Sequence, residues 1–292
     1  MFPKRYYKLV FLFLTPGLVL YLIFVVYPTI NAFIISFFNW RGVSRQMTFA
    51  GLGNYRELFQ DPVLWKALEH NAFFALVFPI AILVPAFIFA LAFQSKVLGA
   101  NLYRIVFLFP NLMSVTVVAI LWSFLYEPTM GPINSGLRLI GLDSLARPWL
   151  GDPKVALPAL VMPIAWINIG FYVLIIHAGL INIPQDLYDA AAMDGAYGWK
   201  RFWYITIPLL WEVITIVTIY VVAGALNEFS IVLIMTNGGP SRATELLTTY
   251  MYKMFLSSEY GYGTAIGVLQ FVLCVFVLVF ARRLMNREAI EF

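Results

Sequence analysis

Polar side chains inside long apolar segments are the residues of this sequence whose types and spacing could do chemistry. Asn227 and Glu228 interrupt one such segment, and Asn168 interrupts another. A polar or ionisable group in hydrocarbon is costly in free energy, so it commonly faces a water-filled path or a neighbouring helix. Amide and carboxylate oxygens beside aromatic rings are the groups that would hold a neutral polyol, which needs hydrogen bonds and flat apolar faces.

Nine residues in three apolar segments form this set of path candidates. They offer a hydrogen-bonding group, an aromatic face or a glycine: Asn111, Ser114, Trp166, Asn168, Phe171, Tyr172, Gly224, Asn227 and Glu228. Residues three apart on a helix are neighbours, so Asn168 and Phe171 would share a face. The alternative for each residue is a contact between packed spans. The residue types therefore predict either a solute path or interhelical bonding.

The sequence contains no motif typical of a catalytic or a metal-binding site. The sequence contains no G-x-x-x-x-G-K-[ST] phosphate loop and no H-E-x-x-H zinc motif. Cys274 is the only cysteine, which excludes an intrachain disulfide, and His70 and His177 are far apart in the sequence. We expect no catalytic residue, no metal site and no cofactor in this chain.

The composition indicates that these segments cross a membrane. Of the 292 residues, 62% are hydrophobic and 12% are charged, whereas an ordinary soluble domain is about 25% charged. Each long apolar run is sufficient for a helix to cross a bilayer. We predict an all-α polytopic membrane protein with a single transmembrane domain over residues 1–292. Its six spans are expected at about 9–37, 70–93, 103–126, 155–180, 207–236 and 262–284.

The distribution of basic residues favours cytoplasmic termini. In that arrangement ten of the 19 Lys and Arg residues lie in the inner segments, which are shorter than the outer ones. The positive-inside rule is therefore met in density more than in number. The pI near 9.1 reflects this lipid-facing bias and does not argue for nucleic acid. We expect a multi-pass protein of the cell (inner) membrane with both termini inside and no nucleic-acid partner.

Two connections carry further structural signals. The outer segment 49–71 reads as a turn followed by one short amphipathic helix. The inner segment 181–206 reads as a short helix with Pro184 in its first turn, ended by Gly195, and then an aromatic helix that leads to Pro208. On these residues alone, the inner segment is either an amphipathic connector on the inner leaflet or a docking element for a cytoplasmic protein.

The inner segment resembles the EAA loop of ABC-importer permeases, whose pattern is E-A-A-x-x-D-G-A-x-x-x-x-x-F-x-x-I-x-L-P. Asp189 stands in place of the leading Glu, and Ile207 stands in place of Leu. The T-x-G-G-P segment at 236–240 also resembles carbohydrate-uptake permeases of the maltose and glycerol-phosphate type. The residues that the resemblance assigns to ATPase coupling are Asp189, Ala190, Ala191, Asp194, Gly195, Ala196, Phe202 and Pro208.

This resemblance implies a fold and a set of partners. The fold would be a type I importer permease bundle with a cytoplasmic coupling helix. The partners would be a second homologous permease in a heterodimer, two cytoplasmic ATPase subunits that carry ATP and Mg, and an extracytoplasmic solute-binding protein that delivers a sugar. The chain itself would then not be an enzyme.

Two rival functions belong to other classes. A proton-coupled secondary transporter would use Glu228 as the proton carrier, and would leave the inner loop without a role. An integral membrane enzyme would need a catalytic cluster, and the sequence shows neither a Ser/His/Asp-like set nor paired carboxylates.

Overall fold

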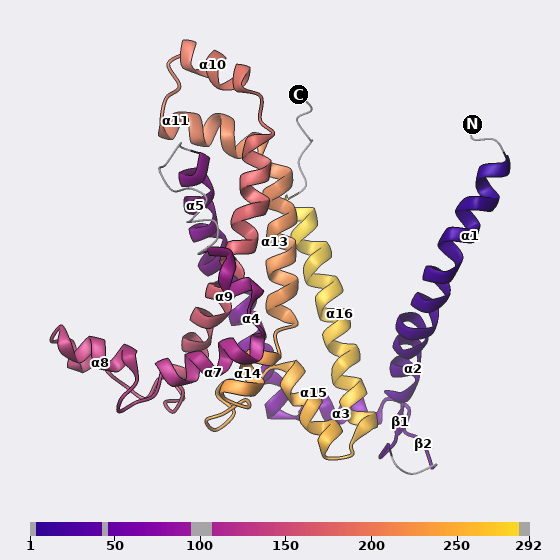
Figure 1. Ribbon diagram of the computed structural model, residues 1–292. Helices are drawn as coiled ribbons and strands as arrows, with labels where there is room; N and C mark the ends of the chain where they lie inside the picture. Colours follow the sequence, from indigo (N-terminus) through magenta and orange to yellow (C-terminus); the bar gives the residue numbers. More distant parts are fainter. Residues whose placement is uncertain (1–3, 43–45, 95–106, 286–292) are drawn as a thin grey trace. The chain divides into compact units, whose positions relative to one another are not determined.

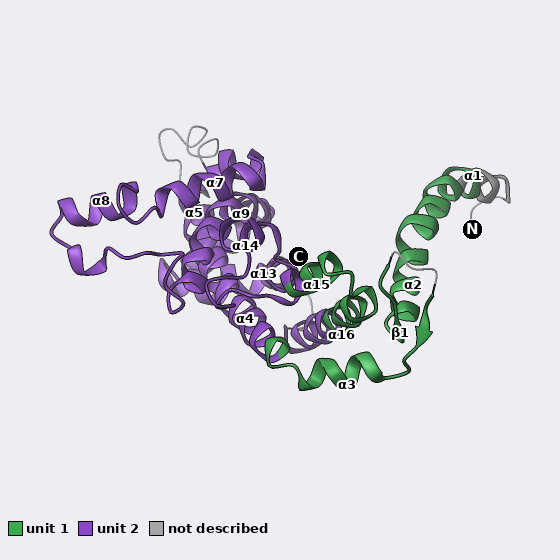
Figure 2. Cartoon of the chain, turned by 90° about the horizontal axis from the view of Figure 1, so that it is seen from below, with its two compact units in different colours: residues 1–64, 250–272 green, residues 65–249, 273–292 purple. Residues whose placement is uncertain are grey.

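The computed structural model describes residues 4–42, 46–94 and 107–285 (Figure 1). Contacts divide the chain into two compact units (Figure 2). Unit 1 contains residues 1–64 and 250–272, and unit 2 contains residues 65–249 and 273–292. Helices dominate both units because a chain in hydrocarbon must satisfy its backbone hydrogen bonds internally.

Unit 1 begins with a long helical run. It consists of α1 (Lys4–Tyr21), the π-helical η1 (Leu22–Val26) and α2 (Tyr27–Ile35). A two-stranded hairpin follows, in which β1 (Phe38–Asn39) pairs antiparallel with β2 (Thr48–Phe49). Helix α3 (Gly53–Gln60) packs against this hairpin, because the buried Asn54 amide donates to the carbonyl oxygens of Ser36 (2.8 Å) and Phe38 (3.0 Å). The hairpin was not predicted.

The expected single amphipathic helix within 49–71 is wrong. Helix α3 ends at Gln60, and α4 (Pro62–Phe78) begins two residues later. Asp61 between them is extended, with φ −81° and ψ 117°, as the residue before a proline prefers. Its carboxylate also accepts the backbone N–H of Val63 at 2.8 Å. The aromatic and aliphatic residues after Asp61 therefore belong to a membrane-spanning helix.

Unit 2 is a helix bundle. Helix α4 continues through the π-helical η2 (Pro79–Leu83) into α5 (Val84–Gln94), and Pro79 coincides with the wide turn because it lacks an N–H. After a short helix at 107–112 come α7 (Val115–Leu125), α8 (Pro132–Leu139), the 3₁₀ turn η3 (Asp143–Leu145) and α9 (Ala156–Ile181). The core of the bundle contains Phe74, Leu160, Ile176 and Val217, which are fully buried.

The second half of unit 2 contains the inner loop and the next span. The loop comprises α10 (Gln185–Met193), α11 (Trp199–Arg201) and the π-helical η4 (Phe202–Thr206). Then come α12 (Ile207–Leu209), α13 (Trp211–Leu226) and α14 (Ser230–Met235). Helices α15 (Leu247–Leu256) and α16 (Tyr260–Met285) end the described chain.

Five helical runs in the described residues are long and apolar enough to cross a membrane. They cover Phe11–Ile35, Pro62–Phe93, Ala156–Ile181, Trp211–Met235 and Tyr260–Met285. They match five of the six predicted spans. The remaining prediction, 103–126, lies partly outside the described residues, and its described part is broken at Met113 and Ser114. Backbone atoms of this segment approach α9 at Gly170, where a Cβ would lie 2.0 Å from the Phe107 carbonyl oxygen.

Candidate functional site

Helix α10 is closed at its C-terminus by the glycine that the sequence indicated. Gly195 has φ +75°, the left-handed region that glycine occupies most easily. Its N–H donates to the Ala192 carbonyl oxygen at 3.0 Å, and the next N–H, of Ala196, donates to the Ala191 carbonyl oxygen at 2.8 Å. These two bonds form a Schellman motif. Pro184 lies just before the helix, with ψ 135°, and not in its first turn as predicted.

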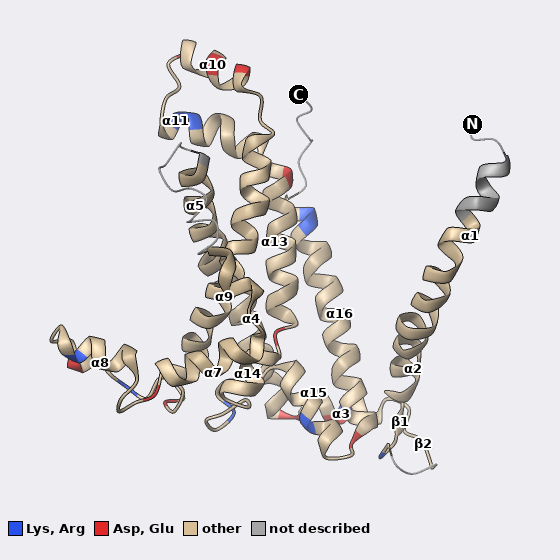
Figure 3. Ribbon diagram, in the orientation of Figure 1, with Lys and Arg blue, Asp and Glu red and all other residues tan. Residues whose placement is uncertain are grey.

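The predicted coupling residues of α10 fall on two faces. Asp189, Ala190, Asp194 and Gly195 are exposed, whereas Ala191 is only 5% exposed. Figure 3 shows acidic residues on α10 and basic residues on α11. The exposed small residues allow close approach of another surface, and the carboxylates beside them can pair with cations. Ala191 instead packs inward, so it is not part of the accessible surface.

The second half of the loop is a continuous aromatic helix. Residues 199–209 run through α11, η4 and α12, and α13 begins after a turn at Leu210. Phe202 and Pro208 are half-buried, and Ala196 at the turn is also half-buried. The rings of Trp199 and Phe202 stack with centroids 5.3 Å apart. This helix contacts α10, because the Arg201 guanidinium carbon lies 5.2 Å from the centre of the Tyr188 ring. The next span starts at Trp211, slightly later than predicted.

Two of the path candidates on α9 and around Ser114, namely Asn111 and Trp166, contact a neighbouring helix. Asn111 donates to the Ile167 carbonyl oxygen at 3.2 Å, and the Asn168 amide donates to the Ile164 carbonyl oxygen at 2.7 Å. Trp166 lies edge-on to Trp122, with ring centroids 6.0 Å apart. Ser114 precedes α7, Tyr172 is buried and Phe171 is 44% exposed. The Asn111 bond joins two helices, as the packing alternative requires, whereas the Asn168 bond lies within α9 and does not decide between the alternatives.

The candidates between α13 and α14 lie at a break in the helix. The Glu228 carboxylate accepts the backbone N–H groups of Phe229 (3.0 Å) and Ile231 (3.1 Å), and therefore caps α14. Asn227 donates to the Ala223 carbonyl oxygen at 2.9 Å and lies 3.7 Å from the Cys274 sulfur. A Cβ atom added at Gly224 itself would have no neighbouring heavy atom within 4 Å. The structure brings Gly224, Asn227 and Glu228 together at the end of α13, where the Asn227 N–H donates to the Gly224 carbonyl oxygen at 3.2 Å.

A buried polar network around this break was missed at the sequence level. Asn71 on α4 donates to the Leu226 carbonyl oxygen (3.1 Å) and accepts the Leu247 N–H (3.0 Å). His70 lies 2.8 Å from the Glu245 carbonyl oxygen. The Glu245 carboxylate, 1% exposed, accepts the Thr249 hydroxyl at 2.6 Å. The only sequence signal was the unusual polarity of the T-E-L-L-T-T stretch at 244–249.

The segment 236–240, which carries the T-x-G-G-P pattern, forms a closed turn. Thr236 and Thr244 bond through their hydroxyls at 2.7 Å, and the Thr244 hydroxyl also lies 2.7 Å from the Gly239 carbonyl oxygen. The turn is held beside α14, because the Thr236 hydroxyl also donates to the Val232 carbonyl oxygen at 2.9 Å.

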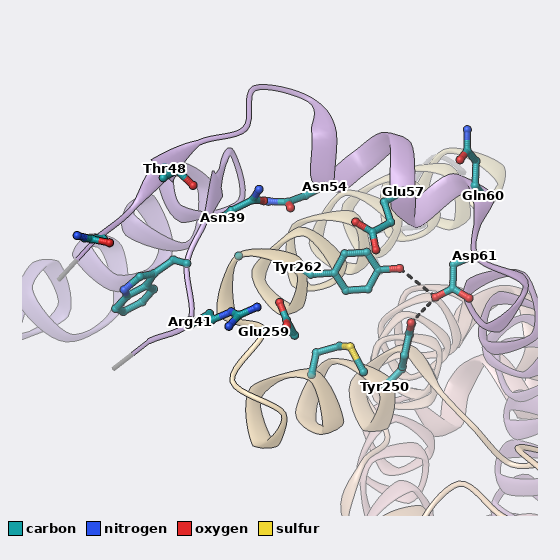
Figure 4. A pocket seen from close by; sticks show the side chains of 14 residues that line it. Asn39, Arg41, Thr48, Asn54, Glu57, Gln60, Asp61, Tyr250, Glu259 and Tyr262 are labelled. Atoms are coloured by element: carbon teal, nitrogen blue, oxygen red, sulfur yellow. Dashed lines mark hydrogen bonds between the residues drawn. The ribbon is translucent and has the colours of Figure 1, made fainter. Parts of the chain in front are cut away.

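Unit 1 contains a polar pocket that the sequence did not suggest, here named the hairpin pocket. Its volume is about 830 Å³, and the β1–β2 hairpin, α3, α15 and the start of α16 line it. Asp61 accepts hydrogen bonds from the hydroxyls of Tyr250 and Tyr262, the latter at 2.9 Å (Figure 4). Three acids and Arg41 line the pocket, so it favours neutral or cationic groups. None of the path candidates lines it.

Most of the chain matches the sequence model of a known protein family. A sequence model described as "Binding-protein-dependent transport system inner membrane component" matches residues 82–289. That range contains α9, the whole inner loop and α13–α16.

Individual proteins agree with this match. The chain is 35% identical to the probable ABC transporter permease protein YurN of Bacillus subtilis, over 90% of this chain and 91% of that one. It is 32% identical to the lactose transport system permease protein LacF of Rhizobium radiobacter, over 98% and 96%. The fold also matches a crystallised bacterial alginate ABC transporter in complex with an alginate pentasaccharide-bound periplasmic protein. The TM-score is 0.81 at 22% identity, and 98% of each chain is covered.

Proposed function

Because this chain belongs to the family of binding-protein-dependent transport system inner membrane components, we propose that it is one membrane-spanning subunit of an ATP-driven importer. The solute would be a sugar or a sugar derivative. The observation that carries the proposal is α10, a short exposed helix held by the Gly195 turn. Its accessible face contains small and acidic residues. A helix of this kind offers a shape and a charge pattern to a cytoplasmic partner.

The energy for uptake would come from that partner. The chain has no phosphate loop, so ATP and Mg would bind to two separate ATPase subunits. When the ATPase pair closes on ATP, it would pull on α10, and the aromatic helix 199–209 would transmit the displacement to α13. The membrane subunit would then alternate between inward-open and outward-open states.

A second, homologous permease would complete the path. Tyr220 is exposed on α13, and Asn227 is exposed directly after its last residue. Phe171 on α9 is 44% exposed. An amide facing lipid is costly, so the exposed end of α13 at Asn227 would face water in a path or another protein. The similarity to a lactose transport permease supports a sugar as the solute. The complex of the alginate transporter with a periplasmic protein supports delivery by a binding protein.

In this importer, the termini and the inner loop would lie in the cytoplasm. The density of Lys and Arg in the inner segments supports this orientation. The rival role of Glu228 as a proton carrier finds little support, because its carboxylate is already engaged by two backbone N–H groups.

Reconstitution separates the two functions. The chain would be co-expressed with its neighbouring permease, ATPases and binding protein, and incorporated into liposomes. Uptake of labelled saccharides that requires internal ATP and the binding protein supports the importer. Uptake driven by a pH gradient alone, without ATPase subunits, would overturn it.

A further inference from the structure

A second cavity lies beneath the inner loop in unit 2. It has a volume of about 450 Å³ and is here named the loop pocket. Residues from α5, α10 and the 199–209 helix line it, including Leu91, Gln185, Tyr188, Trp199, Arg201 and Phe202. None of these is a path candidate, but Phe202 is one of the predicted coupling residues, and the Gln185 amide donates to the Asp189 carboxylate at 3.1 Å. The pocket therefore adjoins the coupling surface, and the function described so far does not assign a ligand to it.

Tyr188 supplies a buried polar group that lacks a partner. The side chain is 6% exposed, and its hydroxyl makes no hydrogen bond to any described residue. Nearly all buried hydroxyls are bonded in native proteins, because an unpaired one loses its hydration without compensation. A hydroxyl at the wall of a cavity is readily satisfied by a ligand that enters the cavity.

Arg201 supplies a positive charge at the same wall. Its guanidinium carbon lies 5.2 Å from the centre of the Tyr188 ring. Stacking on a ring face uses none of the five N–H donors of the group. The residue is also exposed. These donors can therefore form a paired contact with a phosphate, which arginine recognises in a bidentate manner.

The remaining walls and the surroundings are those of a membrane–water boundary. Trp199 and Phe202 stack on each other, and Leu91 adds an apolar wall. Next to the pocket, Trp203 and Tyr204 are 50% and 76% exposed. Exposed Trp and Tyr side chains gather at the headgroup level of bilayers. The pocket thus has a polar end with Tyr188 and Arg201 and an apolar end with Leu91 and Phe202.

We propose that the loop pocket binds the phosphate headgroup of an anionic phospholipid from the cytoplasmic leaflet. The Arg201 guanidinium would hold the phosphate, the Tyr188 hydroxyl would donate to one of its oxygens, and an acyl chain would follow Leu91 and Phe202. The proposal takes from the proposed function only the cytoplasmic placement of the loop. A lipid bound here would connect α10 to the 199–209 helix and stiffen the element that couples to the ATPase.

The test measures lipid binding directly. The purified importer, in detergent, would be titrated with phosphatidylglycerol or phosphatidylcholine and analysed by native mass spectrometry. Wild type is expected to retain phosphatidylglycerol preferentially. Tyr188→Phe keeps the ring and removes the hydroxyl, whereas Arg201→Gln removes the charge. Loss of a charged hydrogen bond corresponds to about tenfold weaker binding for Arg201→Gln, with a smaller loss for Tyr188→Phe.

Lys200→Gln is the matched control, because Lys200 is an exposed neighbour of equal charge that does not line the pocket. It should weaken binding by less than Arg201→Gln. Equal losses in the two charge variants, or no preference for phosphatidylglycerol, would overturn the proposal. A third arm adds inorganic phosphate. Displacement of the lipid by millimolar phosphate would identify a site for free phosphate, and would also overturn a lipid ligand. Because the readout is binding, its failure leaves the ATP-dependence of uptake untouched.

Discussion

Replacement of Gly195 tests whether the turn that ends α10 is required for coupling. The residue has φ +75°, and an added Cβ would meet no atom within 4 Å. Gly195→Ala therefore introduces backbone strain without a clash. Left-handed geometry costs a residue with a Cβ about 1–2 kcal/mol, which lowers the population of the closed turn roughly 5- to 30-fold relative to wild type. Asparagine tolerates this conformation better, so Gly195→Asn should be milder.

Hydrogen exchange and ATP hydrolysis report this effect together. The amides of residues 195 and 196, which bond to Ala192 and Ala191, should exchange faster in Gly195→Ala, and solute-stimulated ATP hydrolysis should fall. Gly195→Pro should be more severe, since it also removes the Gly195 N–H, while membrane insertion stays intact. Gly136→Ala is the control, because Gly136 is helical and its Cβ site is open. Unchanged exchange of the Ala196 amide in both Gly195→Ala and Gly195→Pro would refute this reasoning.

Three further predictions concern carboxylates. Glu228→Ala should destabilise the protein by about 1 kcal/mol, because α14 loses its cap. Glu228→Gln keeps an acceptor and should retain ATP-driven uptake. If Glu228 were a proton carrier, Glu228→Gln would abolish transport. Asp61→Ala should lower the thermal midpoint more than Tyr262→Phe, because it leaves two tyrosine hydroxyls and the Val63 N–H without their acceptor; equal shifts would contradict this. The Met130 N–H and the Thr129 hydroxyl hold the pKa of Glu127 below its usual range. The stabilising effect of the Glu127 carboxylate is therefore full at neutral pH and lost as pH falls below about 4. The protection factors of the 129–130 amides, which are corrected for the intrinsic pH dependence of exchange, should fall there in wild type but not in Glu127→Gln.

The sequence predicted those features of the fold that depend on local pattern. Five spans follow from apolar length, and the Gly195 turn follows from the residue that favours positive φ. The break between α3 and α4 was also present in the sequence, as Asp61 before Pro62. The continuous apolar pattern on both sides concealed it, and the predicted helix ran across the proline.

Features that depend on distant contacts could not be predicted. Ala190 and Ala191 are the same residue type in one nine-residue helix, and only the packing of that helix distinguishes the exposed Ala190 from the buried Ala191. Glu228 looked like an isolated charge in a span. A buried hydrogen bond between Asn71 and Leu247, 176 positions apart, holds the segment at Leu247 beside the break between α13 and α14. The hairpin pocket likewise joins Asp61 to Tyr250 and Tyr262.

Site-specific crosslinking from α10 is the most direct test of the central claim, that a cytosolic ATPase grips this helix. Cys274 would be changed to serine, and a single cysteine carrying a short photoactivatable group would be placed at exposed Ala190 or at Ala191, which is 5% exposed. In membranes that contain the assembled importer, Ala190→Cys should give an adduct with an ATP-hydrolysing subunit, and Ala191→Cys should give little or none. Absence of an adduct from Ala190→Cys, or equal adducts from both positions, would contradict the account.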